Sequence, residues 1–133
     1  MKELNASGKR KMAIARARIR EGSGKITINK IPYQHLSMFR KMLIDEPLVI
    51  AQEQLGSLTF DIEITVRGGG QESRVEACRL AIAKAIVAFS KSEKLKKAYI
   101  AYDRNLLVAD VRRKETYKPG DSKARAKRQK SYR

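Results

Sequence analysis

The chain has 133 residues, 42% of them hydrophobic, which suits one domain with a modest core rather than full disorder. Its 30 lysines and arginines against 14 acids give a formal net charge of +16, and such a surface indicates a polyanionic partner. One cysteine excludes an internal disulfide and fits a reducing compartment. One histidine excludes a histidine-cluster metal site, and no apolar run approaches the length of a membrane span.

The positive charge is concentrated at the two ends of the chain. Residues 1–20 hold seven cationic side chains and one acid, and residues 112–133 hold ten and two. The stretch between, residues 21–111, holds thirteen cationic and eleven acidic side chains, so it is nearly neutral. We expect a globular domain over residues 1–111 and an extended basic tail over residues 112–133. The tail contains no Leu, Ile, Val, Phe or Met, so burial cannot offset its ordering entropy and it is expected to be disordered alone.

The first strand signals lie near the N-terminus. Residues 12–20 alternate apolar side chains with arginines, so a strand there would have an apolar inner face and an outer row of arginines. Residues 25–30 alternate again, with two isoleucines inward. The turn residues at 22–24 between these stretches predict a hairpin, and Ser7-Gly8 is expected to be a loop or turn.

The rest of the chain predicts helices around one further strand. Pro32 can open a helix, and the sequence Asp-Glu-Pro at 45–47 is expected to end it and start a second short one. The clearest strand is marked by strict alternation of apolar and polar residues, followed by a glycine triplet. The later helices are marked by apolar residues that recur every three or four positions. These later elements are a strand over 58–67, helices over 72–90 and 93–102, and a short strand or extended run over 106–111.

Several residues carry both a chemical and a structural interpretation. The glycines at 68–70 would let a backbone approach phosphate or would form a tight strand–helix turn, and both interpretations stay open. The Gly-Ser-Gly-Lys run at 22–25 lacks the spacing of a Walker phosphate loop. His35 suits a helix surface and Cys78 suits an apolar helix face. Because no Ser–His–Asp or Cys–His set can be assembled, an enzymatic role is disfavoured.

Two separate basic segments favour folded RNA as the polyanion. A basic tail alone is most simply a solvated, nonspecific segment, but here a second basic segment belongs to the expected sheet. Lysine and arginine neutralise phosphates, and Tyr117 and Tyr132 in the tail could stack on unpaired bases. The alternative is a general nucleic-acid-binding architectural protein, which would bind duplex DNA equally well. No helix-turn-helix or zinc-finger signature supports that alternative.

Short motifs along nearly the whole chain resemble those of one protein family. They occur at residues 7–16, 24–29, 46–48, 68–70, 78–83, 103–104 and 127–133. Their order and spacing resemble the small-subunit ribosomal protein nine family, and the closing Gln-Lys-Ser-Tyr-Arg is similar to its archaeal and eukaryotic branch. The short length favours the archaeal side. One departure is Glu72, which puts a negative charge beside the glycine triplet where the family commonly repeats a Gly-Gln pair.

The resemblance implies an α/β fold like that of the second domain of ribosomal protein S5, with helices packed on a four-stranded sheet. It implies a structural, non-enzymatic protein of the cytoplasmic ribosome that binds small-subunit rRNA in the head, contacts neighbouring head proteins, and extends its tail towards peptidyl-site tRNA. No cofactor, membrane or small-molecule substrate is expected. The expected rRNA-binding residues are Lys9, Arg10, Lys11, Arg16, Arg18, Arg20, Arg112, Arg113, Lys114, Lys118, Lys123, Arg125, Lys127 and Arg128, and the expected tRNA-proximal residues are Lys130, Tyr132 and Arg133.

Overall fold

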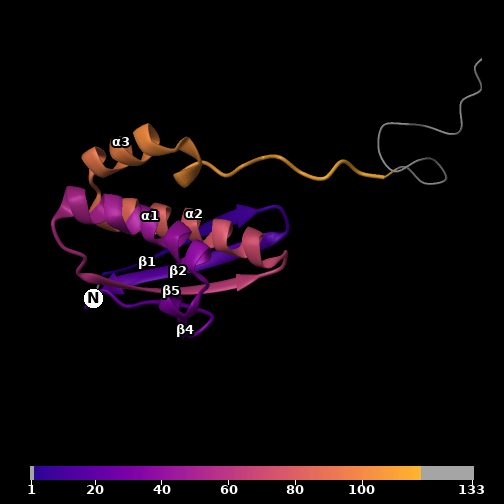
Figure 1. Cartoon of the computed structure of the whole chain (residues 1–133). Helices are drawn as coiled ribbons and strands as arrows, with labels where there is room; N and C mark the ends of the chain where they lie inside the picture. Colours follow the sequence, from indigo (N-terminus) through magenta and orange to yellow (C-terminus); the bar gives the residue numbers. More distant parts are fainter. Residues whose placement is uncertain (1, 118–133) are drawn as a thin grey trace, which may run out of the picture.

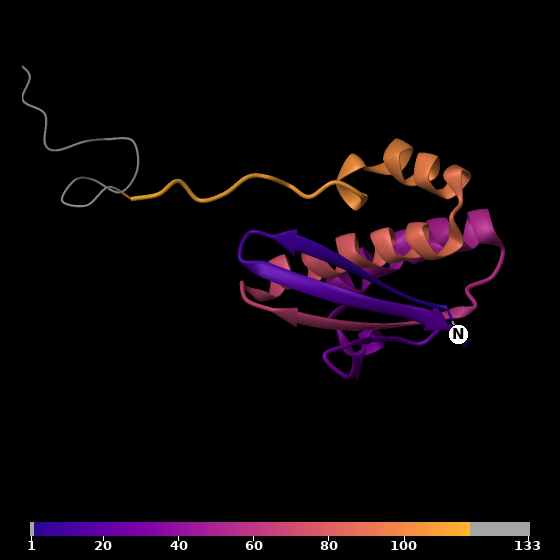
Figure 2. The same ribbon diagram turned by 180° about the vertical axis from the view of Figure 1, so that it is seen from behind.

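One mixed sheet and three α-helices make up the part of the chain that the computed structural model describes, residues 2–117 (Figure 1). Helices α1 and α2 cover one face of the sheet, and α3 lies on the side of these helices away from the sheet (Figures 1 and 2). In chain order the elements are β1 (Glu3–Arg10), β2 (Ala13–Glu21), β3 (Ile26–Ile28), β4 (Ile31–Pro32), the 3-10 turn η1 (Tyr33–His35), α1 (Met38–Leu55), β5 (Phe60–Arg67), α2 (Gln71–Ser90), α3 (Glu93–Tyr102) and the 3-10 turn η2 (Arg104–Leu106).

The sheet has the strand order β1-β2-β5-β3-β4, which is five strands rather than the four expected. Strand β5 runs antiparallel to β2 and parallel to β3, with α1 forming the crossover between β3 and β5. The expected hairpin between residues 12–20 and 25–30 is therefore wrong, because β5 inserts between these two stretches. Alternation of side chains assigns the two faces of a strand but not its neighbours, so it could not show that β5 lies between β2 and β3.

The sequence indicated neither β1 nor β4, and Pro32, which was expected to open a helix, lies in β4, six residues before α1 begins at Met38. Strand β1 corrects the expected loop at Ser7-Gly8. It pairs with β2 along its whole length, from Glu3 opposite Arg20 to Arg10 opposite Ala13. Its inward positions include a glycine and an arginine, so it shows no apolar alternation. Gly8 is buried because β1 lies directly against α2, where a Cβ atom would collide with the carbonyl oxygen of Ala77.

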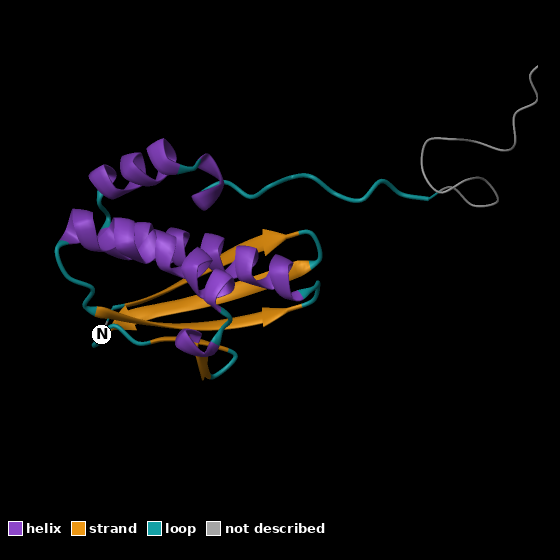
Figure 3. Cartoon of the chain, in the orientation of Figure 1, coloured by secondary structure: helices purple, strands orange, loops and turns teal. Residues whose placement is uncertain are grey.

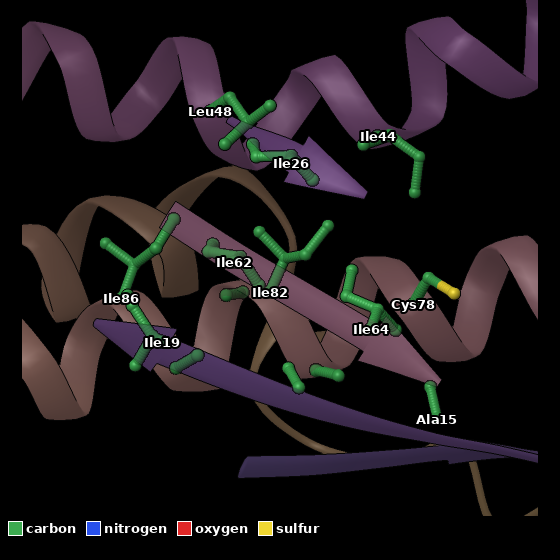
Figure 4. Close-up of a cluster of buried hydrophobic side chains, with 14 of the residues drawn as sticks. Ala15, Ile19, Ile26, Ile44, Leu48, Ile62, Ile64, Cys78, Ile82 and Ile86 are labelled. Atoms are coloured by element: carbon green, nitrogen blue, oxygen red, sulfur yellow. The ribbon is translucent and has the colours of Figure 1, made fainter. Parts of the chain in front are cut away.

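The core lies between the sheet and the two covering helices, as Figure 4 shows. Strand β5 contributes its alternate apolar residues and β2 contributes a run of alanines, which lets α2 approach the sheet closely. The middle of α2 is buried on nearly all sides because α1 packs against it as well. Residues that Figure 4 draws in this cluster include Ile19, Ile26, Ile44, Leu48, Ile62, Ile64, Cys78, Ile82 and Ile86.

Helix α1 is continuous through Pro47, so the expected break at residues 45–47 is wrong. The proline cannot donate to the carbonyl four residues earlier, which weakens the helix at that point. Tertiary contacts hold it instead: Tyr99 of α3 donates a 2.7 Å hydrogen bond to the carbonyl of Pro47, and Tyr33 donates one of 2.8 Å to Asp45. Burial, together with the Asp45 contact, raises the pKa of Tyr33 to about 12.

The strand expected over 58–67 and the helices expected over 72–90 and 93–102 are confirmed within one or two residues. Ser92 caps α3 by accepting a hydrogen bond from the amide of Leu95. The expected run at 106–111 is a short 3-10 turn followed by chain without helix or strand. That chain passes the β1–β2 turn and leads away from the body (Figure 2).

Candidate nucleic-acid interface

The face of the sheet opposite the helices, which we call the open face, is not covered by any described helix (Figure 3). Side chains of β1, β2 and β5 that alternate with the core residues project from it. A shallow depression of about 890 Å³ lies over these strands. Its lining includes Ser7, Met12, Ile14, Arg16, Thr65 and Arg67.

The arginine row of β2 lies on the open face as the alternation predicts, but its members differ in their partners. Arg18 Nε is 3.1 Å from Oε1 of Glu3, and Arg20 Nη2 is 3.4 Å from Oε1 of Glu63. Arg16 has no ion-pair partner among the described residues and stands opposite Ser7 and Thr65, whose side chains are neutral. The part of the row nearest the β2 C-terminus is therefore largely compensated, whereas Arg16 is not.

The uncompensated charge gathers at the other end of the open face, beside the β1–β2 turn. Lys9 and Arg67 lie opposite Ile14 on either side of it, and Lys11 is in the turn itself with a φ of 53°. None of these cations has an acidic partner among residues 2–117. We call Lys9, Lys11, Arg16 and Arg67 the cationic end.

Sequence reasoning missed Arg67, although its parity in the alternating strand assigns it to the same face as the β2 arginines. Around it the depression also exposes Met12 and Ile14, by 76% and 45%. A surface of this composition can accept phosphates on its rim and riboses or bases at its centre.

Arg10 lies apart from the other expected contacts. It is on the helix-facing side of β1, where its Nε donates a 2.6 Å hydrogen bond to Glu76 and its Nη1 is 3.5 Å from Asp110. Of the expected tail contacts, Arg112 bonds to Asp110 with most of its side chain exposed, and Lys114 lies over the ring of Tyr117. Arg113 donates to two backbone carbonyls. The other expected contacts lie outside the described residues: Lys118, Lys123, Arg125, Lys127, Arg128, Lys130, Tyr132 and Arg133.

The glycine triplet serves a tight turn. Gly68 and Gly69 adopt positive φ values of 80° and 64°, and a Cβ atom on Gly68 would collide with the carbonyl oxygen of Met12. Arg74 donates a 3.0 Å hydrogen bond to the Gly68 carbonyl, which fixes the turn further. The charge of Glu72, the departure from the family pattern, is compensated by Arg40 at 2.9 Å.

The remaining candidate chemistry has structural explanations. Cys78 is buried, and burial raises the pKa of its thiol to about 12, so it stays protonated. His35 is exposed on η1. Within residues 2–117, no cluster of three histidine, cysteine or acidic side chains could hold a metal ion. No helix of this part of the chain is long and apolar enough to cross a membrane.

The described residues, 2–117, form a small basic α/β domain with one open sheet face and cations without acidic partners at one end of it. Comparison with known proteins identifies its family: the family model for ribosomal protein S9/S16 matches residues 8–133, and the chain belongs to this family. "Small ribosomal subunit protein uS9" of Methanococcus vannielii is 48% identical over 136 residues, covering the whole of both chains. The protein of the same name from Methanothrix thermoacetophila is 46% identical over 134 residues, also covering both chains fully.

Family membership confirms the resemblance read from the motifs, including its archaeal type. The chain is a ribosomal protein with a structural rather than an enzymatic role. Its place is the ribosome of the cytoplasm.

Proposed function

We propose that the protein is a structural component of the small ribosomal subunit, that it binds rRNA of the subunit head beside neighbouring head proteins, and that its tail extends towards peptidyl-site tRNA. The relatives carry the name of a small-subunit protein over the full length of the chain, which supports the assembly. The distribution of charge over the open face supports the mode of binding.

The observation that carries the proposal is the unequal pairing of the cations on the open face. A cation without an acidic neighbour can neutralise a phosphate and release counterions, which supplies most of the sequence-independent affinity for nucleic acid. At the cationic end, Arg16 and Arg67 meet this condition on adjacent strands. Arg18 and Arg20 already have carboxylates within 3.1 and 3.4 Å. The cationic end is thus the part of the folded domain that docks on rRNA.

The tail supplies the second basic surface. Its ten cations and its lack of large apolar side chains suit phosphates in crowded RNA rather than a protein core. The resemblance carries Lys130, Tyr132 and Arg133 to positions near the tRNA backbone. In this division of labour the folded domain and the proximal tail anchor the protein, and the tip helps to hold tRNA.

Sedimentation of the chain with small subunits tests this proposal. The full chain is expected to co-migrate with subunits through a moderate-salt wash. A chain lacking residues 130–133 is expected to co-migrate equally but to leave tRNA less firmly held in the peptidyl site. Loss of co-migration on removing these four residues would contradict the division of labour.

Competition with duplex DNA tests the alternative of a general architectural protein. Folded small-subunit rRNA is expected to compete far better than duplex DNA of equal phosphate concentration. Equal competition would favour the architectural function instead.

A further inference from the structure

We propose that Asp110 is a positioning residue that fastens the root of the tail, residues 110–113, to the end of β1, so that the tail leaves the domain beside the cationic end. This inference rests on the proposed function of the tail. It concerns a residue of the opposite charge to those proposed to bind RNA, two positions before Arg112, the first tail arginine.

Asp110 organises the root by accepting several hydrogen bonds from it. Its carboxylate accepts from the backbone amide of Arg112 at 2.9 Å and from the guanidinium Nε and Nη2 of the same residue at 2.9 and 2.7 Å. Arg113 folds back to donate to the carbonyl of Asp110 at 2.9 Å. The hydrogen bonds from Arg112, with the nearby charge of Arg10, lower the pKa of Asp110 well below its usual range, so it is charged at neutral pH.

Arg10 joins this root to the folded domain. Its Nη1 is 3.5 Å from Oδ2 of Asp110, an ion-pair contact in which this buried nitrogen makes no hydrogen bond to the described residues. Its Nε donates a hydrogen bond to Glu76 of α2 at 2.6 Å. The side chains of Arg10 and Asp110 are each only 15% exposed. The relay Glu76–Arg10–Asp110–Arg112 therefore connects α2, β1 and the root, and its first two members belong to long regular elements.

This relay has a different use from phosphate binding. Arg10 is engaged by two carboxylates, and the Asp110 carboxylate would repel a phosphate, so neither residue is suited to contact RNA directly. What the relay sets is direction: in Figures 1 and 2 the chain after η2 leaves on the helix side of the sheet and extends past the β1–β2 turn, whose Lys9 and Lys11 belong to the cationic end. Two linked binding surfaces whose separation is fixed at a spacing that matches the partner act at a higher effective concentration than two surfaces joined by a loose linker.

The direction in which Asp110→Asn changes RNA affinity distinguishes a positioning role of Asp110 from a purely electrostatic effect of its charge. Asp110→Asn removes a negative charge from a basic protein, so electrostatics alone would strengthen rRNA binding. The positioning role requires the reverse, a loss of roughly two- to tenfold in affinity, because the tail would no longer start from a fixed point. Glu53→Gln is the matched control, since it makes the same charge change at an exposed residue of α1.

Hydrogen exchange on the full free chain and binding to small-subunit rRNA together test the inference. We expect Asp110→Asn and Arg10→Gln each to speed exchange of the Arg112 amide severalfold, with exchange in β2 unchanged, and the double variant to be no faster than the singles. Unchanged exchange in both single variants overturns the relay. rRNA affinity of Asp110→Asn equal to or above that of Glu53→Gln overturns its positioning role. Failure of the unaltered chain to bind rRNA would instead refute the proposed function, while the exchange result would still decide on the relay.

Discussion

Arg18 of β2 and Glu3 of β1 form an ion pair across the first two strands, with Nε 3.1 Å from Oε1. Both side chains are about half exposed, at 55% and 46%, so water screens the pair and its contribution to stability is small. What the pair changes is the charge that Arg18 offers to a partner outside the protein.

Glu3→Gln is expected to release Arg18 and to strengthen rRNA binding. The free energy of unfolding should change by less than about 1 kcal/mol, since exposed ion pairs contribute little. Binding to small-subunit rRNA and urea unfolding measure the two effects. Glu53→Gln, with the same change of charge away from the open face, is expected to have a smaller effect on affinity. An equal gain from both variants would mean that the pairing itself does not matter.

Gly8→Ala is expected to destabilise the fold by about 1–3 kcal/mol, as overpacking does in other cores. The added Cβ atom would lie 2.8 Å from the amide nitrogen of Ala81 and closer still to the Ala77 carbonyl, and backbone atoms of a helix cannot move aside. Urea unfolding measures the loss. Ser7→Ala, one residue earlier on the open face, is the control and should stay within about 0.5 kcal/mol of the unaltered chain. Equal stability of the two variants would contradict the close contact of β1 with α2.

Asp61→Ala is expected to loosen the loop between β2 and β3. The carboxylate accepts hydrogen bonds from the backbone amides of Lys25, Ser23 and Gly24 at 2.9, 3.0 and 3.1 Å. These bonds, that of Lys25 foremost, lower the pKa of Asp61. The loss at neutral pH should be about 1–2 kcal/mol, similar to that of a helix cap.

The contribution of Asp61 has a defined dependence on pH. Since the pKa is lower in the folded state, the stabilisation is fully present above the unfolded value near 4 and is lost as the pH falls through the folded pKa. The difference in unfolding free energy between the unaltered chain and Asp61→Ala should therefore shrink on acidification. A difference that is constant from pH 7 to pH 3 would show that the charged carboxylate is not what holds the loop.

The sequence predicts well those elements whose own residues decide their structure. Strand β5 and helices α2 and α3 carry clear alternation or helical spacing, and each lies where it was expected. Strand β1 has no such pattern, because pairing with β2 and contact with α2 make it a strand. The continuity of α1 through Pro47 depends likewise on Tyr99, a residue far along the chain.

The sequence likewise predicts one part of the candidate interface, the face on which the arginines lie, but not their ion-pair partners. Parity along β2 assigns the arginines to one face, and the structure bears this out, but parity does not reveal which acid lies beside which arginine. The register places Glu3 opposite Arg20 and Glu63 opposite Arg18, yet the ion pairs form diagonally, Arg18 with Glu3 and Arg20 with Glu63. Arg16 has only neutral side chains opposite it. Arg10, one of three basic residues in a row, turns inward because strand positions alternate.

The salt dependence of binding to small-subunit rRNA tests most directly the claim that the cationic end docks on RNA. The double variant Arg16→Gln/Arg67→Gln is compared with Arg18→Gln/Arg20→Gln, which removes the same charge from the same face. Each lost phosphate contact should lower the slope of log affinity against log salt concentration by about 0.7–0.9. For Arg16→Gln/Arg67→Gln we expect the slope to fall by close to the amount of two lost phosphate contacts. For Arg18→Gln/Arg20→Gln we expect the slope to fall by less than half as much. Equal decrements, or a larger one for Arg18 and Arg20, would contradict the account.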